Sequence, residues 1–355
     1  MTAEPDSGAA RAPGRPAAAP GPAVDVFLPA GQFPGASHGD ALRAATAYAQ
    51  AAEAAGFHGA WLAEHHFIGY GVCPSAVAFA GYLLGRTSRL RVGTAAAILS
   101  NRHPVALAEE AVLLDELSGG RFDLGVARGG PWVDLEVFGT GPERLHPDGF
   151  AEALDLLTAW RSGAARIGGD GPLFRFRPVA VVPRPAAARP VWVAATSAGT
   201  VELAAARGLP LLLGVHATDA EKKDLLDRYA DAAARHGHDP AGVPHASAHL
   251  AYVADCGRRA VDDLRAAMPA WLATTAQYVR LDGTAGPARD LDAYLAHLLE
   301  IHPVGDPAEC VERLAASLAA TGVRRLLLMV EGAGDPVRTT ESIARLGAEV
   351  LPLLR

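Results

Sequence analysis

Short apolar runs rich in β-branched residues alternate along this sequence with longer stretches in which apolar residues recur at helical spacing. Such alternation is typical of βα units that pair into a parallel sheet. Eight runs are predicted to be strands, at residues 24–28, 59–62, 90–98, 121–126, 190–195, 210–215, 246–254 and 325–330. Eight such units close naturally into a (β/α)8 TIM barrel. An open doubly wound sheet is the rival, but no GxGxxG pattern follows the first run to support it.

Amphipathic stretches rich in Ala and Leu separate the predicted strands and are predicted to be helices. Several begin at a proline or a capping residue, as helix starts should. They cover residues 40–55, 74–84, 104–117, 148–160, 200–207, 220–235, 256–272, 307–320 and 337–351.

Two segments depart from the plain alternation. Residues 174–182 precede the fifth strand, and there Phe174 and Phe176 alternate with Arg175 and Arg177, which predicts an insertion that is either a strand pair or an excursion of the chain. Residues 278–304, between the seventh and eighth strands, form a long connection with a partly helical run at 291–301. Connections of this length are often lids over a functional site, and an inert surface insertion is the alternative.

Composition narrows the class of protein. Half of the 355 residues are hydrophobic and a fifth are charged, which suits an enzyme with a sizeable core, and no apolar run is long enough to cross a bilayer. Residues 1–22 are dominated by Ala, Pro and Gly, so we interpret them as a disordered leader, not a signal peptide, before one domain at 23–355.

Charge and cysteine spacing exclude several kinds of partner. The net charge is −7 and no clustered basic stripe is present, which argues against nucleic acid. Cys73, Cys256 and Cys310 are widely separated and show no CxxC spacing, which argues against a disulfide framework or a cysteine zinc site. A reducing, cytoplasmic location is therefore expected.

Polar residues follow several predicted strands, and in a barrel of this type the carboxyl ends of the strands carry the catalytic groups. The third strand ends in small side chains between Thr94 and Ile98, which would let a flat ring approach the backbone. The second, fourth, fifth and eighth strands are followed by Glu64-His65-His66-Phe67, Ala127-Arg128-Gly129-Gly130, Thr196-Ser197-Ala198-Gly199-Thr200 and Glu331-Gly332-Ala333-Gly334.

The adjacent histidines leave three interpretations open. Successive strand residues point to opposite faces, so His65 and His66 cannot both face one ion, and no further ligand spacing accompanies them. A metal site is therefore the weakest interpretation. A structural hydrogen-bonded pair remains, and an acid–base or positioning role for at least one imidazole is favoured.

Arg128 fits either a surface turn or a phosphate site. Ser197 and Thr200 flank the predicted start of a helix, where hydroxyl and backbone N–H donors are available. A guanidinium at the same end of the barrel could add bidentate hydrogen bonds to a phosphate. Both interpretations stay open on these residues alone.

Several motifs in order give the chain a family resemblance. They are Glu64-His65-His66-Phe67 and the runs at 91–96, 103–105, 113–122, 125–129, 137–140, 191–197, 208–210 and 303–310. Together they resemble the α-subunit of bacterial luciferase and its flavin-dependent monooxygenase relatives, over nearly the whole chain after the leader.

The resemblance implies roles around a flavin ring. His65 matches the family histidine needed for oxygenation, which is expected to stabilise, or pass a proton to, a flavin C4a-peroxide; His66 is a second candidate. Ala95 and Ala96 match a pair joined by a non-prolyl cis peptide under the isoalloxazine ring. Asp134 falls where an aspartate near the flavin influences its reactivity.

The resemblance also implies an FMN phosphate site. Arg128, Ser197 and Thr200 match the family's phosphate ligands, and Ala195 and Thr196 belong to the same strand-to-helix turn. This agrees with one of the two interpretations of Arg128 reached from the residues alone.

Three positions depart from the luciferase pattern. Ala127 stands where luciferase has a reactive cysteine, and Thr196 replaces an acidic residue. Val215 replaces a tryptophan of the aldehyde pocket, although Trp271 matches another pocket residue. The resemblance therefore implies flavin oxygenation but leaves luminescence with a long-chain aldehyde in doubt.

The expected function is a two-component monooxygenase that takes FMNH2 from a separate flavin reductase and uses O2 to oxygenate a small organic, polyketide-like substrate. Two alternatives remain: a deazaflavin-dependent hydride-transfer enzyme and a non-catalytic flavin-binding subunit. The resemblance also implies a homodimer, with the Ala/Leu-rich helix at 104–117 as a candidate for the shared face.

Overall fold

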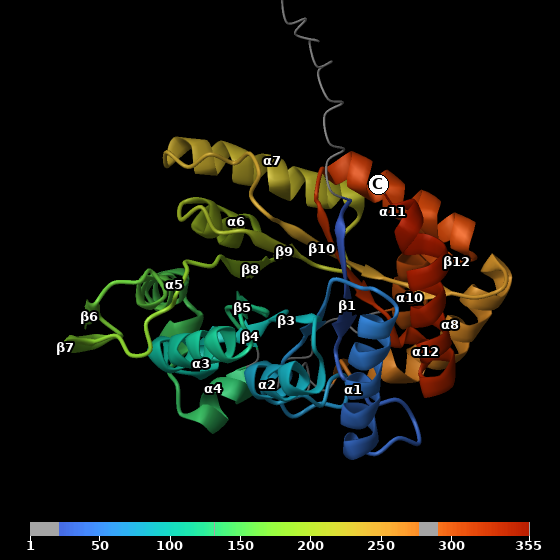
Figure 1. The fold of residues 1–355 in the computed structure, drawn as a ribbon, viewed down its shortest axis with the longest axis horizontal. Helices are drawn as coiled ribbons and strands as arrows, with labels where there is room; N and C mark the ends of the chain where they lie inside the picture. Colours follow the sequence, from blue (N-terminus) through green and yellow to red (C-terminus); the bar gives the residue numbers. More distant parts are fainter. Residues whose placement is uncertain (1–20, 131, 277–289, 355) are drawn as a thin grey trace, which may run out of the picture.

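The computed structural model of the chain describes residues 21–130, 132–276 and 290–354. Eight parallel strands close into a barrel, in which β1 pairs with both β2 and β13 and β3 pairs with β5 (Figure 1). In chain order the strands are β1 (Ala23–Leu28), β2 (Gly59–Leu62), β3 (Arg91–Thr94), β5 (Phe122–Ala127), β8 (Val191–Ala195), β9 (Leu211–Leu213), β10 (Ala246–Leu250) and β13 (Arg325–Met329). The predicted (β/α)8 TIM barrel is confirmed.

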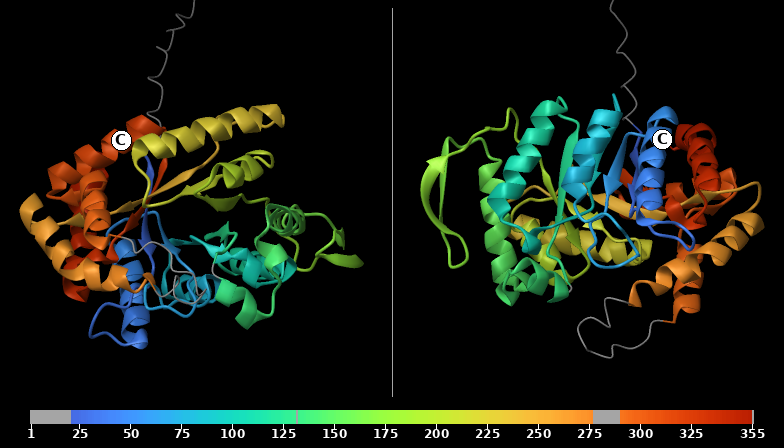
Figure 2. Two further views of the ribbon diagram at one scale, coloured as in Figure 1. Left: turned by 180° about the vertical axis from the view of Figure 1, so that it is seen from behind. Right: turned by 90° about the horizontal axis from the view of Figure 1, so that it is seen from below.

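Helices cover the outside of this barrel (Figure 1, Figure 2). They are α1 (His38–Ala54), α2 (Ala76–Arg86), α3 (Pro104–Leu117), α4 (Trp132–Phe138), α5 (Pro147–Trp160), α6 (Ala198–Ala205), α7 (Asp219–Arg235), α8 (Gly257–Ala273), α10 (Leu291–Ile301), α11 (Pro307–Thr321) and α12 (Pro336–Arg345). Ser37, Thr218 and Asp306 form capping boxes that start α1, α7 and α11. None of the helices described here has both the length and the apolar character needed to span a membrane.

The predicted helices are all present with small shifts at their ends. The last, expected at 337–351, ends as an α-helix at Arg345 and continues through a π-helical turn (Leu346–Val350) and a 3-10 turn (Leu351–Leu353). Hydrophobic spacing cannot distinguish these closely related helical windings, because each keeps the apolar residues on one side.

The barrel strands separate two apolar layers, because successive side chains point to opposite faces. Outward-facing residues such as Val26 and Leu62 belong to the large core beneath the helices. Inward-facing Trp61 and Trp192 fill the barrel, with their rings edge to face and their centroids 5.3 Å apart. Gly93 makes room for them, because a Cβ there would lie 2.6 Å from the Trp61 ring.

A layer of charged side chains occupies the amino-terminal end of the barrel. The Asp25 carboxylate accepts hydrogen bonds from Arg325 Nε (2.7 Å) and Trp61 Nε1 (2.9 Å). Asp123 accepts from Arg325 Nη2 (3.2 Å) and Arg91 Nε (3.0 Å). Burial alone would raise the pKa of Asp25, but the charge and hydrogen bonds of its partners, chiefly Arg325, lower it. Arg325 is thus the cation shared by two buried carboxylates.

Two predicted strands are divided in the structure. The run at 90–98 splits into β3 and β4 (Ala97–Ile98), with a cis peptide bond between them. The run at 246–254 splits into β10 and β11 (Tyr252–Val253), which leaves the barrel to pair with β12 (Val304–Gly305). Apolar residues continue through both divisions, so periodicity alone does not reveal them.

The insertion predicted before the fifth barrel strand is an antiparallel hairpin of β6 (Arg166–Asp170) and β7 (Arg175–Ala180), which projects beside α5 (Figure 2). The extended run predicted at 174–182 contains β7. Its partner β6 carries no strand signal, because Gly168 and Gly169 interrupt the alternation at a β-bulge. A Cβ at Gly169 would lie 2.4 Å from the carbonyl oxygen of Phe174, so the bulge requires glycine there.

The long connection between the seventh and eighth barrel strands contains α10 at Leu291–Ile301, the helical run that the sequence predicts. Residues 278–289 of that connection lie outside the described residues, as do residues 1–20 of the predicted leader.

We expect Arg325→Ala to lower the free energy of unfolding by about 3–5 kcal/mol, because it leaves two buried carboxylates without their shared cation. Chemical denaturation at pH 7 measures this loss. Arg43→Ala is the control, because the Arg43–Asp40 pair is exposed and such pairs contribute about 0–1 kcal/mol. Equal losses in the two variants would show that the charged layer does not stabilise the barrel.

Candidate active site at the carboxyl ends of the strands

An apolar floor covers the barrel interior at the carboxyl ends of the strands. Its side chains are partly exposed and rest on the buried interior cluster, and most of them are no larger than a methyl group. They are Phe27, Ala95, Ala127, Ala194 and Val215. Such a surface lets a flat ring lie close to the backbone of the strands.

The peptide bond between Ala95 and Ala96 is cis, as the resemblance implies. The N–H of Ala95 donates to the carbonyl oxygen of Leu62 at 2.7 Å, which links this bond to the end of β2. Ala96 is buried, whereas Ala95 belongs to the floor. The cis pair therefore lies at the rim of the barrel, where a ring on the floor would contact it.

Glu64 is a buried carboxylate directly after β2. It accepts N–H bonds from Ala76 (3.0 Å) and Ile98 (3.1 Å), and both of its oxygens accept from Arg102 Nη2 at 3.0 Å. The residue before His65 is thus tied to the start of α2 and the end of β4. The sequence motif contains Glu64 but assigns it no role; its signal is an acidic residue directly after a buried strand.

His65 carries a neutral imidazole at the rim. Its ring packs edge to face against Tyr70, with centroids 5.2 Å apart. Burial, reinforced by the neighbouring His66, lowers the pKa of His65 to about 4. The Nδ1 atom is buried beside Gly71 and has no hydrogen-bond partner among the described residues. The other ring nitrogen, Nε2, is therefore the one that can serve the site.

His66 has different neighbours from His65. Its ring packs edge to face against Phe138 at 4.9 Å, and its Nε2 lies 3.6 Å from a Glu64 oxygen. With the half-exposed Phe67 it lines a surface cavity of about 380 Å³. Across the ranges that the structure describes, no group of three or more His, Cys, Asp or Glu side chains is arranged to hold a metal ion.

Asp134, on α4, lies next to this cavity. Its Oδ2 accepts a hydrogen bond from Asn101 Nδ2 at 3.2 Å, and Asn101 lines the same cavity as His66. Its Oδ1 is buried without a partner in the described structure, and burial raises the pKa of the carboxyl group. Asp134 is therefore a poorly solvated acid on the His66 side of the rim.

Arg128 follows β5 at the same rim. β5 pairs with β8 in a register that matches Val126 with Val193, which brings Arg128 level with Ala195 at the end of β8. Ala195 is buried and offers only its backbone, whereas Thr196 is exposed. Within the described ranges the Arg128 guanidinium makes no hydrogen bond or ion pair. It is therefore available to an anion.

The turn after β8 supplies further donors. Ser197 is the N-cap of α6, and its Oγ accepts the N–H of Thr200 at 3.4 Å and lies 3.1 Å from the Thr200 hydroxyl. The N–H groups of Ala198 and Gly199 open the helix, where backbone donors have no intrahelical partner. Two hydroxyls and a helix N-terminus thus follow the end of β8, the strand that pairs with the one before Arg128.

The two residues predicted in the substrate pocket lie in different surroundings. Val215, just after β9, belongs to the floor. Trp271 on α8 is fully buried, and its ring stacks with those of Phe33 (4.9 Å) and Tyr70 (4.7 Å). Trp271 therefore packs against Tyr70 and holds it in place. The sequence motifs contain no signal for Tyr70, because its place beside His65 depends on this tertiary stack.

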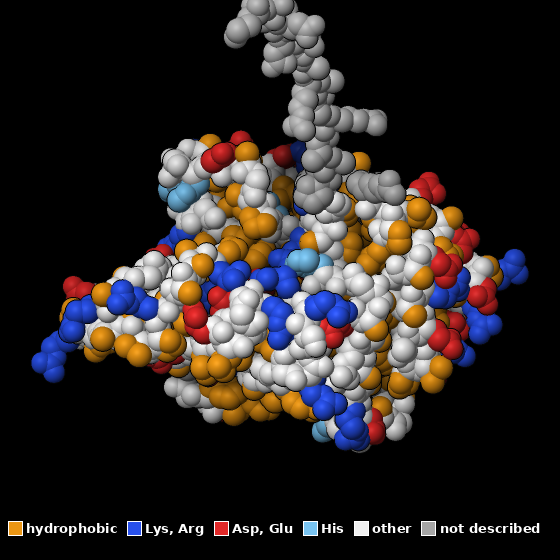
Figure 3. All heavy atoms as spheres, viewed as in Figure 1, with side chains coloured by type: hydrophobic (Ala, Val, Ile, Leu, Met, Phe, Trp, Pro, Cys, Tyr) orange, Lys and Arg blue, Asp and Glu red, His pale blue; other side chains and the backbone are white. Residues whose placement is uncertain are grey.

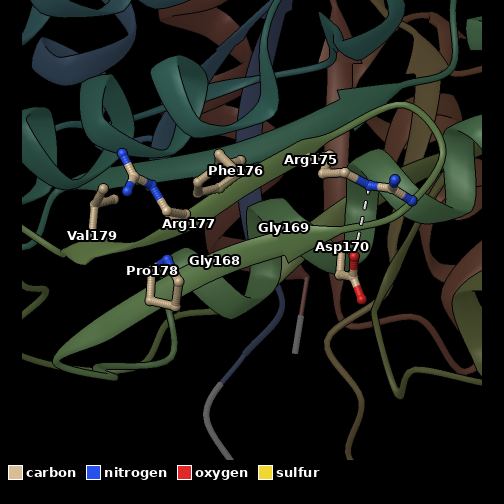
Figure 4. Close-up of a pocket in the computed structure, with 8 residues that line it drawn as sticks. All are labelled: Gly168, Gly169, Asp170, Arg175, Phe176, Arg177, Pro178 and Val179. Carbon is tan, nitrogen blue, oxygen red and sulfur yellow. Dashed lines mark ion pairs between the residues drawn. The ribbon is translucent and has the colours of Figure 1, made fainter.

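A wide concavity of about 950 Å³ lies elsewhere, on the β6–β7 hairpin (Figure 4). It is lined by Gly168, Gly169, Asp170, Arg175, Phe176, Arg177, Pro178 and Val179. One ion pair crosses it, between the exposed side chains of Arg175 and Asp170 at 3.7 Å. It is open because Gly168 and Gly169 carry no side chains, and no strand end of the barrel reaches it. The rim, where the polar groups converge, is the better candidate.

Comparisons with known proteins agree with this geometry. The family model described as luciferase-like monooxygenase matches residues 23–325. The alkanal monooxygenase alpha chain of the Kryptophanaron alfredi symbiont is 32% identical over 332 residues, which cover 86% of this chain and 91% of that protein.

Two solved structures share the fold. One is the FMN-bound oxygenating constituent of the 3,6-diketocamphane monooxygenase of Pseudomonas putida, with a TM-score of 0.74 and 19% identity over 94% of this chain and 98% of that one. The other is an F420-dependent secondary alcohol dehydrogenase, with a TM-score of 0.75 and 18% identity over 94% and 99% of the two chains. With the family match, these findings show that the chain belongs to the luciferase-like monooxygenase family and is an oxidoreductase.

Proposed function

We propose that this chain is the oxygenating component of a two-component monooxygenase, which binds FMNH2 from a separate flavin reductase and uses O2 to oxygenate a small, polyketide-like organic substrate. One observation carries the proposal. Arg128, which has no partner among the described residues, and the neutral His65 follow two strands of the same closed barrel, and the alanine-rich floor lies at the same rim.

The phosphate end of FMN fits the turn after β8. Arg128 would pair with two phosphate oxygens, and the hydroxyls of Ser197 and Thr200 and the first N–H groups of α6 would donate to the others. One such cluster suits the single phosphate of FMN. A cofactor phosphate there would pair with the charge of Arg128, for which the described residues supply no counter-charge.

The ring end of FMN fits the floor. Ala95, Ala127 and Ala194 present only methyl groups there, so an isoalloxazine could lie against the strands beside the cis bond before Ala96. When bound and reduced, FMN supplies the electrons that activate O2. The protein's own task is then to orient the ring and keep water from it.

His65 would manage a proton at the ring end. Its imidazole is neutral at pH 7 because burial lowers its pKa, so Nε2 can hold or accept a proton without the cost of a buried cation. His66 would be the second candidate for this role, and Asp134 would influence the reactivity of the cofactor. Val215 on the floor and Trp271 behind Tyr70 would shape the substrate end of the pocket.

A deazaflavin-dependent hydride transfer is the second candidate, because the fold is equally close to an F420-dependent dehydrogenase. A non-catalytic flavin-binding subunit is the third. Titration of the apoprotein with FMN and with the deazaflavin decides between the first two. The non-catalytic subunit is favoured if the protein binds FMN but its mixture with reduced FMN and O2 yields only H2O2.

A cytoplasmic location and a homodimer complete the proposal. All three cysteines are free thiols, as in a reducing compartment.

Hydrophobic side chains gather over α4 and the adjoining helices along the lower edge of the face in Figure 3. Tyr82 on α2, Leu113 and Leu117 on α3 and Phe138 on α4 are large and exposed. Large exposed apolar side chains are common where one protein surface contacts another.

His65→Ala tests the oxygenation. The chain, with FMN, a flavin reductase, NADH and O2, is offered a long-chain aldehyde, a cyclic ketone and an aromatic polyketide. The wild type should convert at least one, whereas His65→Ala should bind FMN within about twofold of the wild type but form product about 10²-fold more slowly and release H2O2. His236→Ala, an exposed histidine, is the control. Unchanged product yield in His65→Ala would remove this imidazole from the mechanism.

Arg128→Ala should weaken FMN binding by about 10- to 100-fold, because a charge-assisted hydrogen bond to phosphate is lost. Riboflavin lacks the phosphate, so its affinity should stay within about twofold. Fluorescence titration measures both, and Arg177→Ala on the exposed hairpin is the control. Equal losses for FMN and riboflavin would move the phosphate site elsewhere.

The double variant Leu113→Lys, Leu117→Lys should convert the homodimer to a monomer, because two charges would enter a face that must bury about 800 Å² per partner. Light scattering after size-exclusion chromatography gives the mass. Val337→Lys on α12, also highly exposed, should leave the mass unchanged. A wild-type monomer, or a dimer that survives both lysines, contradicts this interface.

A further inference from the structure

Glu331 is a buried carboxylate at the end of β13, 3% exposed. Its oxygens accept the backbone N–H groups of Ala30 (3.2 Å) and Gly31 (2.7 Å), just beyond the end of β1. No cation pairs with it in the described parts of the chain, and burial raises its pKa to about 7. Buried carboxylates are usually paired, so an unpaired one kept for two backbone N–H groups needs an explanation.

The segment that Glu331 holds lies directly against Trp271. A Cβ at Gly31 would lie 2.8 Å from Trp271 Nε1, so the indole edge rests on the backbone of Gly31. The same Nε1 donates to the carbonyl oxygen of Tyr70 at 2.8 Å, and the two rings stack with centroids 4.7 Å apart. The position of Gly31 therefore sets the position of Trp271, and Trp271 sets that of Tyr70.

Tyr70 then contacts His65, edge to face at 5.2 Å. The segment that carries Tyr70 is also bonded to the segment held by Glu331: Val72 N–H donates to Ala30 at 3.0 Å, and Gln32 N–H donates to Gly69 at 3.1 Å.

Gly71 lies between the His65 imidazole and the backbone of Pro29. A Cβ there would lie 2.5 Å from His65 Nδ1 and 2.6 Å from the carbonyl oxygen of Pro29. The imidazole is thus confined between Tyr70 and a backbone that Glu331 fixes.

We infer that Glu331 is a positioning residue for His65. It holds the chain after β1 against Trp271 and the 69–72 segment, and these fix the imidazole at the rim. The catalytic consequence rests on the proposed function, but the positioning itself does not. Glu331 touches neither His65 nor the floor directly, so it acts only through Gly31, Trp271 and Tyr70.

The test follows the His65 imidazole in the apoprotein. With ¹⁵N-labelled histidine at pH 8, the His65 signals are assigned by their loss in His65→Gln. Glu331→Ala and Gly31→Ala should both shift and broaden them. Gly31→Ala leaves the carboxylate in place and places a Cβ against Trp271, so it tests the relay even if Glu331→Ala folds poorly.

Two matched controls accompany these variants. Glu349→Ala removes an exposed carboxylate that pairs with Arg345, and Gly85→Ala adds a Cβ that meets no atom within 4 Å. Neither should move the His65 signals. Unchanged His65 signals in folded Glu331→Ala and Gly31→Ala would overturn the inference, whatever the enzyme catalyses.

Activity gives an independent readout. If the proposed function holds, product formed per FMNH2 consumed should fall about 10- to 100-fold in Glu331→Ala and Gly31→Ala, since small misplacements of reacting groups have effects of this size. FMN affinity should stay within about twofold, because the phosphate turn is on β5 and β8. Glu331→Gln keeps an acceptor for the Gly31 N–H and should recover most of the yield. A loss of FMN affinity with no change in yield would instead give Glu331 a role in binding.

Discussion

Parallel pairing around a closed ring of eight strands forces every carboxyl end onto the same rim. In an open sheet the ends of β2 and β5 could lie far apart, but here β3 joins both strands and keeps their ends level. The proximity of His65 and Arg128 to one floor is therefore a consequence of barrel closure. No contact between the two residues is needed for it, because the hydrogen bonds of three strands hold them.

The inward-facing positions of the strands fill the amino end of the barrel but leave space at its carboxyl end. At the amino end, inward positions carry Asp25, Asp123 and Arg325, whose mutual hydrogen bonds offset the cost of burying charge. At the carboxyl end, inward positions shrink to Ala127 and Ala194 and leave room above them. A rigid, filled base thus supports an open rim, which suits a site that must hold a flat ring without moving.

Sequence periodicity predicts what depends on local pattern, and it fails where tertiary contacts decide. The eight strands and the helices follow from hydrophobic spacing, and the family motifs place His65, the cis bond before Ala96 and Arg128 at the rim. Strand β6 escapes prediction because Gly168 and Gly169 carry no side-chain signal. Tyr70 escapes because its role depends on stacking against a residue two hundred positions away.

Two buried carboxylates hold the backbone segments around His65, and they do so by different means. Glu64, one residue before it, binds the N–H groups of two distant segments and is compensated by Arg102. Glu331 also binds two N–H groups, but no cation among the described residues pairs with it. Glu331 thus fixes the backbone against which Trp271 and Tyr70 pack, and the burial of His65 beside Tyr70 lowers the pKa of the imidazole.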